Sequence, residues 1–385
     1  TLRRGARGGL VGRRPPGELG RGWVRGGERC RFSRCQVALD LSDNTNLRGT
    51  PPSAVLAARA ADGPSVYARY PSHYGDALKR AAALRFGLEP EEVVTGCGSD
   101  DVIECAIRAF AEPGDTLSML WPSFAMLPYF AKTNGLVPRF VELAGPERGY
   151  DLDVDALLEG EPRITYLCSP NNPTGTLVPR ASIERVLAEA PGLVILDEAY
   201  AEFGGPSYVD RVRESGRLLV VRTLSKAYGL AGARAGYALG ARGLVDTIEK
   251  ARGPYKLSGL AERMGAAALE RDGVWVASYV AEVREARERL AAWLRERGHA
   301  PLPSEANFFF VPIDDAAGRA AWLRERGLGV RPFTALPGLG DGLRISIGPW
   351  SVLEPALALL EAGLGSAEQR AAWGGASLGA GEGSA

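Results

Sequence analysis

Short apolar runs alternate with amphipathic segments through the first two thirds of the chain. In the amphipathic segments, such as 100–111, apolar residues recur every three or four positions, which predicts helices. The short runs between them are continuously apolar, which predicts buried strands. This alternation predicts an α/β fold with a mostly parallel sheet that is covered on both faces. The predicted strands are 93–96, 116–121, 164–168, 193–196, 218–221 and 235–239, and the predicted helices are 100–111, about 124 onward and 181–190.

The pattern changes from about Leu260 onward. A long helix rich in arginine and glutamate is followed by a strand, a short helix and a further strand. This order of elements predicts a second, smaller α+β domain, which the segment around 38–60 is expected to join. The four predicted elements are roughly 274–298, 307–311, 315–326 and 343–347.

Composition is that of an ordinary globular enzyme. Of the 385 residues, 45% are apolar and 24% are charged, and the length suits two domains. No apolar run approaches the ~20 residues that a membrane-spanning helix needs, so we expect no membrane segment. The five cysteines fit neither a disulfide framework nor a zinc site, and we expect reduced thiols in a cytoplasmic protein. These cysteines are Cys30, Cys35, Cys97, Cys105 and Cys168.

The two ends of the chain look different from the rest. Residues 1–36 hold ten arginines and two glutamates, with almost no periodic apolar pattern, and we expect this leader to be disordered. It lacks the aromatic spacing of a nucleic-acid platform and the serines of a transit peptide. We interpret it as translated upstream sequence or a non-functional extension, and expect no nucleic-acid partner. Residues 366–385, rich in glycine, alanine and serine, are also expected to be disordered.

Lysine is rare in this chain, which draws attention to Lys226. Only five of the 46 basic residues are lysines. Lys226 follows the predicted strand 218–221, and Gly229, Gly232 and Arg234 come shortly after it. A desolvated lysine loses its proton and attacks a carbonyl carbon, which arginine does not readily do. The segment indicates a Schiff-base site for a phosphorylated aldehyde, with a surface lysine in a loop as the alternative.

Polar residues also follow other predicted strands, at the edge where open α/β sheets bind ligands. Ser99 and Asp100 stand at the start of a predicted helix, whose free amides and dipole favour an anion. An ordinary helix cap is the alternative. Asn172 lies in the turn 169–175, where two prolines give its side-chain amide a fixed place.

Asp197 follows the apolar strand 193–196, and Tyr200 comes three residues later. A carboxylate at the end of a buried strand is costly unless it has a cationic partner. A pyridinium nitrogen would be such a partner, and Tyr200 could then donate to a phenolate oxygen. A structural ion pair between Asp197 and an arginine is the alternative. With only His73 and His299, the chain offers little material for a Ser-His-Asp hydrolase or a multi-histidine metal centre, and we predict no metal site.

Taken together, these segments resemble the class I/II aminotransferases of fold type I, which depend on pyridoxal 5′-phosphate. The motifs that carry this resemblance are 170–175, 197–200, 223–226 and 234–237. Within that group the chain is most similar to the histidinol-phosphate aminotransferases, through segments 43–46, 69–71, 98–101, 222–234, 330–332 and 343–348.

The resemblance runs from about residue 39 to 364 and implies a fold. It implies a mostly parallel, seven-stranded sheet in a large cofactor-binding domain, residues 61–260. A smaller α+β domain would comprise residues 37–60 and 261–365. Residues 1–36 and 366–385 lie outside it.

The resemblance also implies roles around the cofactor ring. Lys226 would carry the cofactor and shuttle the substrate proton, and Asp197 would keep the pyridine nitrogen protonated. Asn172 and Tyr200 would contact the 3′ oxygen of the ring, while Phe124 would stack on its face.

Further roles concern the phosphate and the substrate. Tyr70 would reach the phosphate bound by a neighbouring subunit, which implies a homodimer. Arg344 would clamp the α-carboxylate of the substrate through a bidentate pair. Asn44, Arg331 and Lys256 complete the expected substrate-binding set. The phosphate would be held by Ser99, Asp100 through its backbone, Thr223, Ser225 and Arg234.

The activity implied is a ping-pong transfer of an amino group between histidinol phosphate, the amino donor, and the oxo acid 2-oxoglutarate, as in histidine biosynthesis.

Several departures from the family pattern bear on the substrate. Where the family usually has Asn-Glu-Asn-Pro, residues 44–47 are Asn-Thr-Asn-Leu, which removes a carboxylate. Phe124 replaces a more usual tyrosine. Lys256 stands where asparagine is common, and contact with a substrate phosphate and a surface position are both open.

Alternatives within the same cofactor class are an aromatic or broad-specificity aminotransferase and an enzyme similar to phosphothreonine decarboxylase. A non-catalytic regulator that binds pyridoxal phosphate is the alternative from another class. Such a regulator would usually carry a fused DNA-binding domain, and the arginine-rich leader does not resemble a helix-turn-helix.

Overall fold

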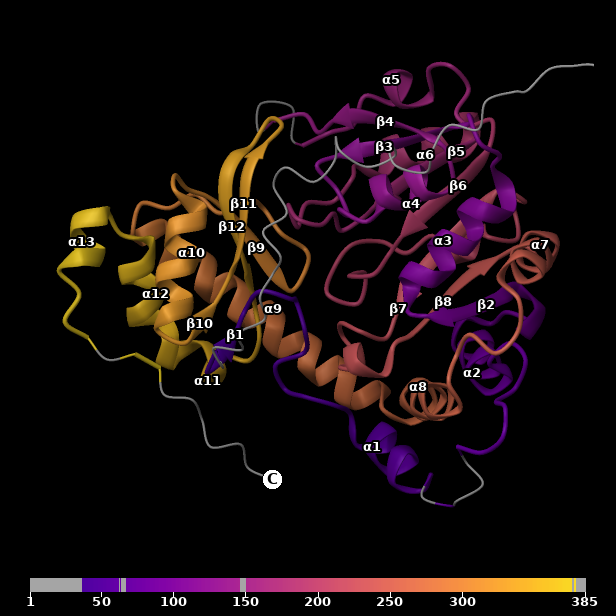
Figure 1. The fold of residues 1–385 in the computed structure, drawn as a ribbon, viewed down its shortest axis with the longest axis horizontal. Coiled ribbons are helices and arrows are strands. Elements are labelled where there is room, and N and C mark those ends of the chain that lie inside the picture. Colours follow the sequence, from indigo (N-terminus) through magenta and orange to yellow (C-terminus); the bar gives the residue numbers. More distant parts are fainter. Residues whose placement is uncertain (1–36, 62, 64–66, 146–149, 376, 379–385) are drawn as a thin grey trace, which may run out of the picture. The chain divides into compact units, whose positions relative to one another are not determined.

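A seven-stranded sheet carries most of the polar strand ends identified above (Figure 1). The structure is a computed structural model that describes residues 37–61, 63, 67–145, 150–375 and 377–378, so the predicted leader 1–36 lies outside the described residues. The strands, in spatial order, are β2 (Val93–Cys97), β8 (Ala235–Gly240), β7 (Leu218–Thr223), β6 (Leu193–Asp197), β5 (Ile164–Cys168), β3 (Thr116–Trp121) and β4 (Val137–Glu142).

The direction of the strands confirms the prediction of a mostly parallel sheet. Strand β8 runs antiparallel to both of its neighbours, β2 and β7. The other neighbouring pairs are parallel. The carboxyl ends of β5, β6 and β7 therefore meet at one edge of the sheet, and Asp197 and Thr223 are the last residues of two of these strands.

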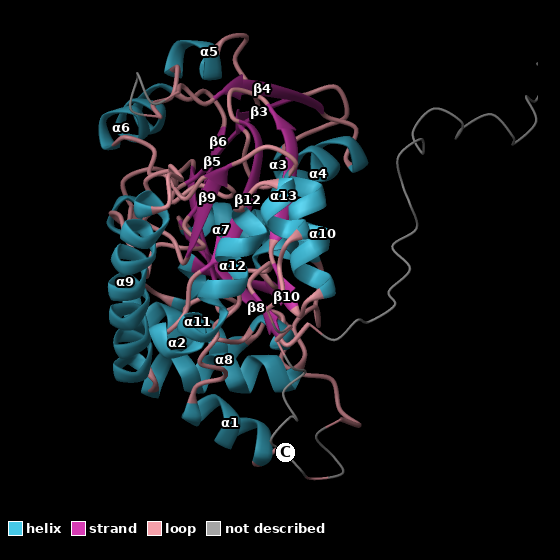
Figure 2. Ribbon diagram, turned by 90° about the vertical axis from the view of Figure 1, so that its left-hand side faces the viewer, coloured by secondary structure: helices cyan, strands magenta, loops and turns pink. Residues whose placement is uncertain are grey.

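Both faces of this sheet are buried, as continuously apolar strands require. In β6, Leu193 and Ile195 face one hydrophobic core while Val194 and Leu196 face the other. Figure 2 shows strands lying between α6 on one side and α3 and α4 on the other. The helices of the first two thirds of the chain are α1 (Pro52–Arg59), α2 (Asp76–Phe86), α3 (Ser99–Phe110), α4 (Leu127–Thr133), α5 (Val154–Leu158), α6 (Arg180–Glu189) and α7 (Arg242–Arg252).

A second, antiparallel sheet follows later in the chain. Its strands, in spatial order, are β11 (Arg331–Leu336), β12 (Gly340–Ser346) and β9 (Phe308–Pro312). Strand β1 (Leu39–Asp40) pairs with β10 (Leu328–Gly329), so residues 39–40 join this part of the chain. The remaining helices are α8 (Gly259–Arg271), α9 (Gly273–Glu296), α10 (Ala316–Glu325), α11 (Trp350–Leu353), α12 (Leu357–Leu364) and α13 (Ala367–Ala371). The domain limits given above stay a prediction.

Two local expectations differ from the structure, and β4 is one of several elements that the sequence patterns did not predict. Strand β4 was not predicted, because its alternating edge pattern includes Pro138 and Arg139. Helix α4 begins at Leu127 rather than near Phe124, since Pro128 favours the first turn of a helix. The expected disorder of the tail is wrong for α13, where Ser366 and Gln369 form a reciprocal capping box. Within the described part of the chain, no helix combines the length and the apolar character that a membrane crossing requires.

Candidate active site

A cavity of about 450 Å³ lies where the ends of β5, β6 and β7 approach the second sheet. This volume falls in the usual range for small-molecule sites. Thirteen of the fifteen predicted site residues line it, while Tyr70 and Lys256 do not. The thirteen are Asn44, Ser99, Asp100, Phe124, Asn172, Asp197, Tyr200, Thr223, Ser225, Lys226, Arg234, Arg331 and Arg344.

Lys226 brings an amine into this cavity from the turn after β7. Its Nζ donates to the backbone oxygen of Asp43 at 3.0 Å and lies 5.8 Å from the centre of the Tyr200 ring. Burial lowers the pKa of Lys226 to about 8, and the positive charge of Arg344 acts in the same direction. A large fraction of this amine is therefore uncharged near pH 8, which is the form that attacks a carbonyl. The alternative of a surface lysine does not hold.

Asp197 lies at the end of β6 and is 4% exposed. Its Oδ2 accepts a hydrogen bond from Tyr166 Oη at 2.8 Å, and its Oδ1 accepts one from the Ala199 amide at 3.0 Å. Burial raises the pKa of the Asp197 carboxyl to about 6, although the Tyr166 hydrogen bond opposes this rise. Arg222 pairs with Glu198 and Glu202 instead, at 2.7 Å and 2.9 Å. Among the described residues no salt bridge involves Asp197, so the alternative of a structural Asp197–arginine pair is wrong.

Tyr200 and Asn172 face the same cavity, and each already holds one partner. Asn44 Nδ2 donates to Tyr200 Oη at 3.1 Å, and Arg344 Nη1 donates to Asn172 Oδ1 at 2.6 Å. The Asn172 oxygen is thus engaged, which leaves its amide nitrogen as the end that donates into the cavity. Phe308 packs edge-on against the Tyr200 ring, with 5.1 Å between the ring centres.

One end of the cavity is suited to an anion. The residue before helix α3 is Gly98, at φ +83°, and in the part of the chain that the structure describes no side chain forms a capping hydrogen bond there. The alternative of an ordinary Ser or Asp cap is therefore wrong, and the first amides of α3 remain available to a ligand. Arg234 lies so close to this turn that a Cβ on Gly98 would come within 2.5 Å of Arg234 Nη2. Ser99, Thr223 and Ser225 supply hydroxyls at the same cavity.

The other end of the cavity is suited to a carboxylate. Arg344, 8% exposed, projects from β12, and burial lowers its pKa from the usual arginine value. Its guanidinium also donates to the backbone oxygen of Ser42. Arg331 and Phe333 line the cavity from the neighbouring strand β11, where Arg331 is directly paired with Arg344 in the sheet. Two arginines side by side favour an anionic group between them.

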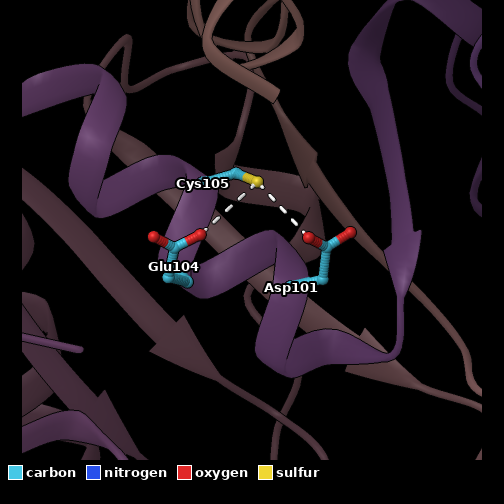
Figure 3. Close-up of side chains that lie close together, drawn as sticks. All are labelled: Asp101, Glu104 and Cys105. Carbon is cyan, nitrogen blue, oxygen red and sulfur yellow. Dashed lines mark hydrogen bonds between the residues drawn. The ribbon is translucent and has the colours of Figure 1, made fainter. Parts of the chain in front are cut away.

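Lys256 and Tyr70 are not brought to this cavity. Lys256 Nζ lies 3.2 Å from Asp101 Oδ1. Figure 3 shows Asp101 beside Glu104 and Cys105 on helix α3. This acidic cluster is already balanced by cations, because Arg108 Nη1 lies 3.3 Å from Glu104. Tyr70 is 83% exposed and stacks on Tyr255, with 4.8 Å between their ring centres.

Two residues that hold the site were not identified from the sequence. Tyr166 reads as one more apolar position of β5, yet its buried hydroxyl needs a partner and finds Asp197. Ser346 reads as a strand residue of β12, yet its hydroxyl donates to Asn44 Oδ1 at 3.0 Å. For Tyr166, the sequence did offer a signal, namely a hydroxyl within a buried apolar strand. The second depends on a contact across 302 positions of the chain.

Chemically, the cavity fits a flat ring that carries a phosphate and an aldehyde. An uncapped helix start and Arg234 suit the phosphate, and Lys226 offers an amine for the aldehyde. The buried Asp197 carboxyl suits a ring nitrogen that is protonated. Arg344 Nε is buried and has no hydrogen-bond partner among the described residues, which suits a further anionic ligand.

Fold and cavity together define an α/β enzyme of the aminotransferase type. The chain belongs to the family "Aminotransferase class I and II", whose model matches residues 36–359. A histidinol-phosphate aminotransferase of Thermoanaerobacter sp. (strain X514) is 35% identical over 286 residues, which cover 72% of this chain and 79% of the relative. One from Geobacter sulfurreducens is 34% identical over 337 residues, covering 84% and 93%.

A solved structure shares this fold. The histidinol-phosphate aminotransferase of Sinorhizobium meliloti, in complex with pyridoxal-5′-phosphate, matches with a TM-score of 0.76 and 27% identity. The match covers 86% of this chain and 91% of that one. Fold type I, expected from the motifs, is confirmed.

Proposed function

We propose that this protein is a pyridoxal-phosphate-dependent aminotransferase that moves an amino group between histidinol phosphate and 2-oxoglutarate. The observation that carries the proposal is that one cavity contains both Lys226, with its lowered pKa, and the buried Asp197, which has no salt-bridge partner among the described residues. The relatives named histidinol-phosphate aminotransferase support the choice of substrates.

The residues around the ring have distinct tasks in this proposal. When bound, pyridoxal phosphate supplies an aldehyde and an electron-withdrawing ring. Lys226 would hold the cofactor through its amine, and this amine would then carry the proton at the substrate α carbon. Asp197 holds a proton on the ring nitrogen, because a carboxylate buried without a cation is stabilised by the positive charge. Asn172 and Tyr200 donate to the ring oxygen, and Phe124 covers the ring face.

The phosphate and the substrate occupy opposite ends of the cavity. Ser99, Thr223, Ser225, Arg234 and the amide of Asp100 hold the cofactor phosphate. Arg344 binds the α-carboxylate of the amino acid or oxo acid. Histidinol phosphate has no carboxylate, so we assign its phosphate to the same end, where Arg331 adds a second positive charge. One anion site would thus serve both substrates of the ping-pong cycle.

We further propose that the enzyme works as a homodimer in the cytoplasm. Tyr70 lies outside its own cavity and is largely exposed, as a residue that serves the partner's site would be in one subunit alone. The three cysteines of the described residues, Cys97, Cys105 and Cys168, are free thiols, which suits a reducing compartment.

A substrate panel tests the proposal directly. Purified protein loaded with pyridoxal phosphate is offered histidinol phosphate, phenylalanine or phosphothreonine, each with 2-oxoglutarate, and glutamate and carbon dioxide are measured. We expect glutamate, fastest with histidinol phosphate, and its loss in Lys226→Ala. Arg331→Gln should slow histidinol phosphate more than phenylalanine. Faster turnover of phenylalanine would favour an aromatic enzyme, and carbon dioxide without glutamate would refute transamination.

A further inference from the structure

Tyr200 Oη has a single hydrogen, and the direction of that hydrogen decides whether the hydroxyl donates into the cavity or away from it. The structure contains a short chain of hydrogen bonds behind this hydroxyl. All three side chains in it are buried: Asn44 is 1% exposed, Ser346 is 0% exposed and Tyr200 is 4% exposed. Solvent therefore does not set the hydrogen-bond directions here.

The chain of hydrogen bonds begins at a backbone amide, which is always a donor. The amide of Asn44 donates to Ser346 Oγ at 2.9 Å. Ser346 Oγ in turn donates its hydrogen to Asn44 Oδ1 at 3.0 Å. The side-chain amide of Asn44 is thereby oriented with its oxygen toward Ser346 and its nitrogen toward Tyr200. Asn44 Nδ2 then donates to Tyr200 Oη at 3.1 Å.

The backbone around Asn44 keeps this arrangement in place. Asn44 adopts φ +55°, a left-handed conformation that asparagine and aspartate tolerate better than most residues. Asn307 Nδ2 donates to the backbone oxygen of Asn44 at 3.1 Å. Ser346 is fixed in strand β12, and its amide donates to the Leu41 oxygen at 2.9 Å. The segment that carries Asn44 is thus tied to strand β12 and to Asn307, the residue before strand β9.

From this geometry we infer that Asn44 and Ser346 are positioning residues, which occupy the lone-pair side of Tyr200 Oη and so force its hydrogen into the cavity. Asn44, which is predicted to bind substrate and lines the cavity, donates its side-chain amide to Tyr200. The inference rests on the proposed function, in which Tyr200 donates to the 3′ oxygen of the bound ring.

The sharpest test reverses the donor–acceptor direction of these hydrogen bonds without changing the shape of the side chain. In Asn44→Asp, a carboxylate replaces the amide, and carboxylates only accept. Ser346 still donates to one oxygen, while the other oxygen now accepts the hydrogen of Tyr200 and draws it away from the cavity. We expect this variant to behave like Tyr200→Phe, with pyridoxal phosphate binding weakened about 10- to 100-fold, the worth of one hydrogen bond to a charged acceptor.

The experiment titrates the full-length apoprotein with pyridoxal phosphate and follows the quenching of protein fluorescence, so that no turnover is needed. Asn44→Asp is measured both in the natural protein and in Tyr200→Phe. The matched control is Asn134→Asp, which adds a carboxylate at a half-buried position outside the cavity, after helix α4, and should change binding less than about twofold. Urea unfolding of each variant separates misfolding from a local effect.

The double variant separates the possible outcomes. If the hydrogen-bond chain acts through Tyr200, Asn44→Asp weakens binding in the natural protein and has almost no further effect in Tyr200→Phe. An equal loss in both backgrounds would reduce the effect to charge repulsion and overturn the inference, as would normal binding by Asn44→Asp. Normal binding by Tyr200→Phe would instead contradict the proposed role of Tyr200 itself.

Ser346→Ala provides an independent variant in case Asn44→Asp does not fold. Without the serine hydroxyl, the Asn44 amide loses the donor that orients it, and both of its orientations become accessible. We expect Ser346→Ala to bind pyridoxal phosphate with a constant between those of the natural protein and Tyr200→Phe. Combined with Tyr200→Phe, it should cause no loss of binding beyond that of Tyr200→Phe alone. Unchanged binding in a folded Ser346→Ala protein would overturn the inference.

Discussion

Replacement of Asp197 by asparagine should stabilise the protein without cofactor while it impairs cofactor binding. Burial raises the pKa of Asp197 from 3.8 to about 6 in the folded chain. The folded state therefore holds this proton more tightly than the unfolded state does. Its stability falls as the pH rises from about 4 to about 6, and above that window the whole cost of the buried charge is present.

The magnitude follows from the size of the shift. A rise of about two pKa units corresponds to about 3 kcal/mol of lost stability at pH 8, at 1.36 kcal/mol per unit. An asparagine side chain at this position would avoid the cost but would give up two hydrogen bonds to a charged acceptor, from Tyr166 and the Ala199 amide. We expect Asp197→Asn to gain about 1 to 3 kcal/mol at pH 8, and roughly half of that gain at pH 5.

Urea unfolding of the apoprotein at pH 5 and pH 8 measures the effect. Asp101→Asn is the matched control: burial opposes its ionisation, but the Cys97 amide and the charge of Lys256 outweigh burial and lower the pKa of Asp101. Asp101→Asn should therefore destabilise the protein at pH 8. With pyridoxal phosphate added, the natural protein should be more stable than Asp197→Asn, because only the Asp197 carboxylate then gains a cationic partner. If Asp197→Asn is no more stable than the natural apoprotein at pH 8, the reasoning fails.

Three further predictions concern other parts of the cavity. Because the pKa of Lys226 is lowered to about 8, the rate at which apoprotein captures pyridoxal phosphate should rise with pH and level off above about 8; stopped-flow absorbance measures this, and a rate that is flat from pH 6 to 9 would contradict it. Gly98→Ala places a Cβ 2.5 Å from Arg234 Nη2, at a backbone φ of +83°. This variant should bind pyridoxal phosphate about tenfold more weakly, while its binding of pyridoxal, which lacks the phosphate, hardly changes. Equal losses for both compounds would argue against a phosphate site here. Lys256 forms its ion pair with Asp101 outside the cavity, so Lys256→Ala should change the KM for histidinol phosphate less than about twofold. Arg331→Ala should raise this KM about tenfold or more. Steady-state kinetics in which Lys256→Ala raised the KM and Arg331→Ala left it unchanged would refute this prediction.

The strands and the strand-end residues could be predicted because their signals are local. Continuous apolar runs such as 193–196 mark buried strands, and Asp197 and Lys226 are conspicuous as polar groups directly after them. The order of the sheet, which sets the strand ends that lie next to one another, could not be read from these local patterns.

What the sequence left open depends on contacts between distant segments. The hydrogen bond between Ser346 and Asn44 spans 302 positions, and the one between Tyr166 and Asp197 joins two neighbouring strands through side chains alone. Neither produces a periodic pattern. Lys256 illustrates the same limit, since its ion pair with Asp101 joins it to a residue on another element. The edge strand β4 was missed because its proline and charges obscure the apolar signal.

The central claim is that Lys226 is the amine that holds pyridoxal phosphate. Borohydride reduction of the loaded protein turns a carbon–nitrogen linkage between cofactor and lysine into a stable amine, and peptide mass spectrometry then locates it. With only five lysines in the chain, the assignment is direct. We predict one modified peptide, containing Lys226. Modification of Lys79, Lys132, Lys250 or Lys256 with Lys226 unmodified, or no modification at all, would contradict the account.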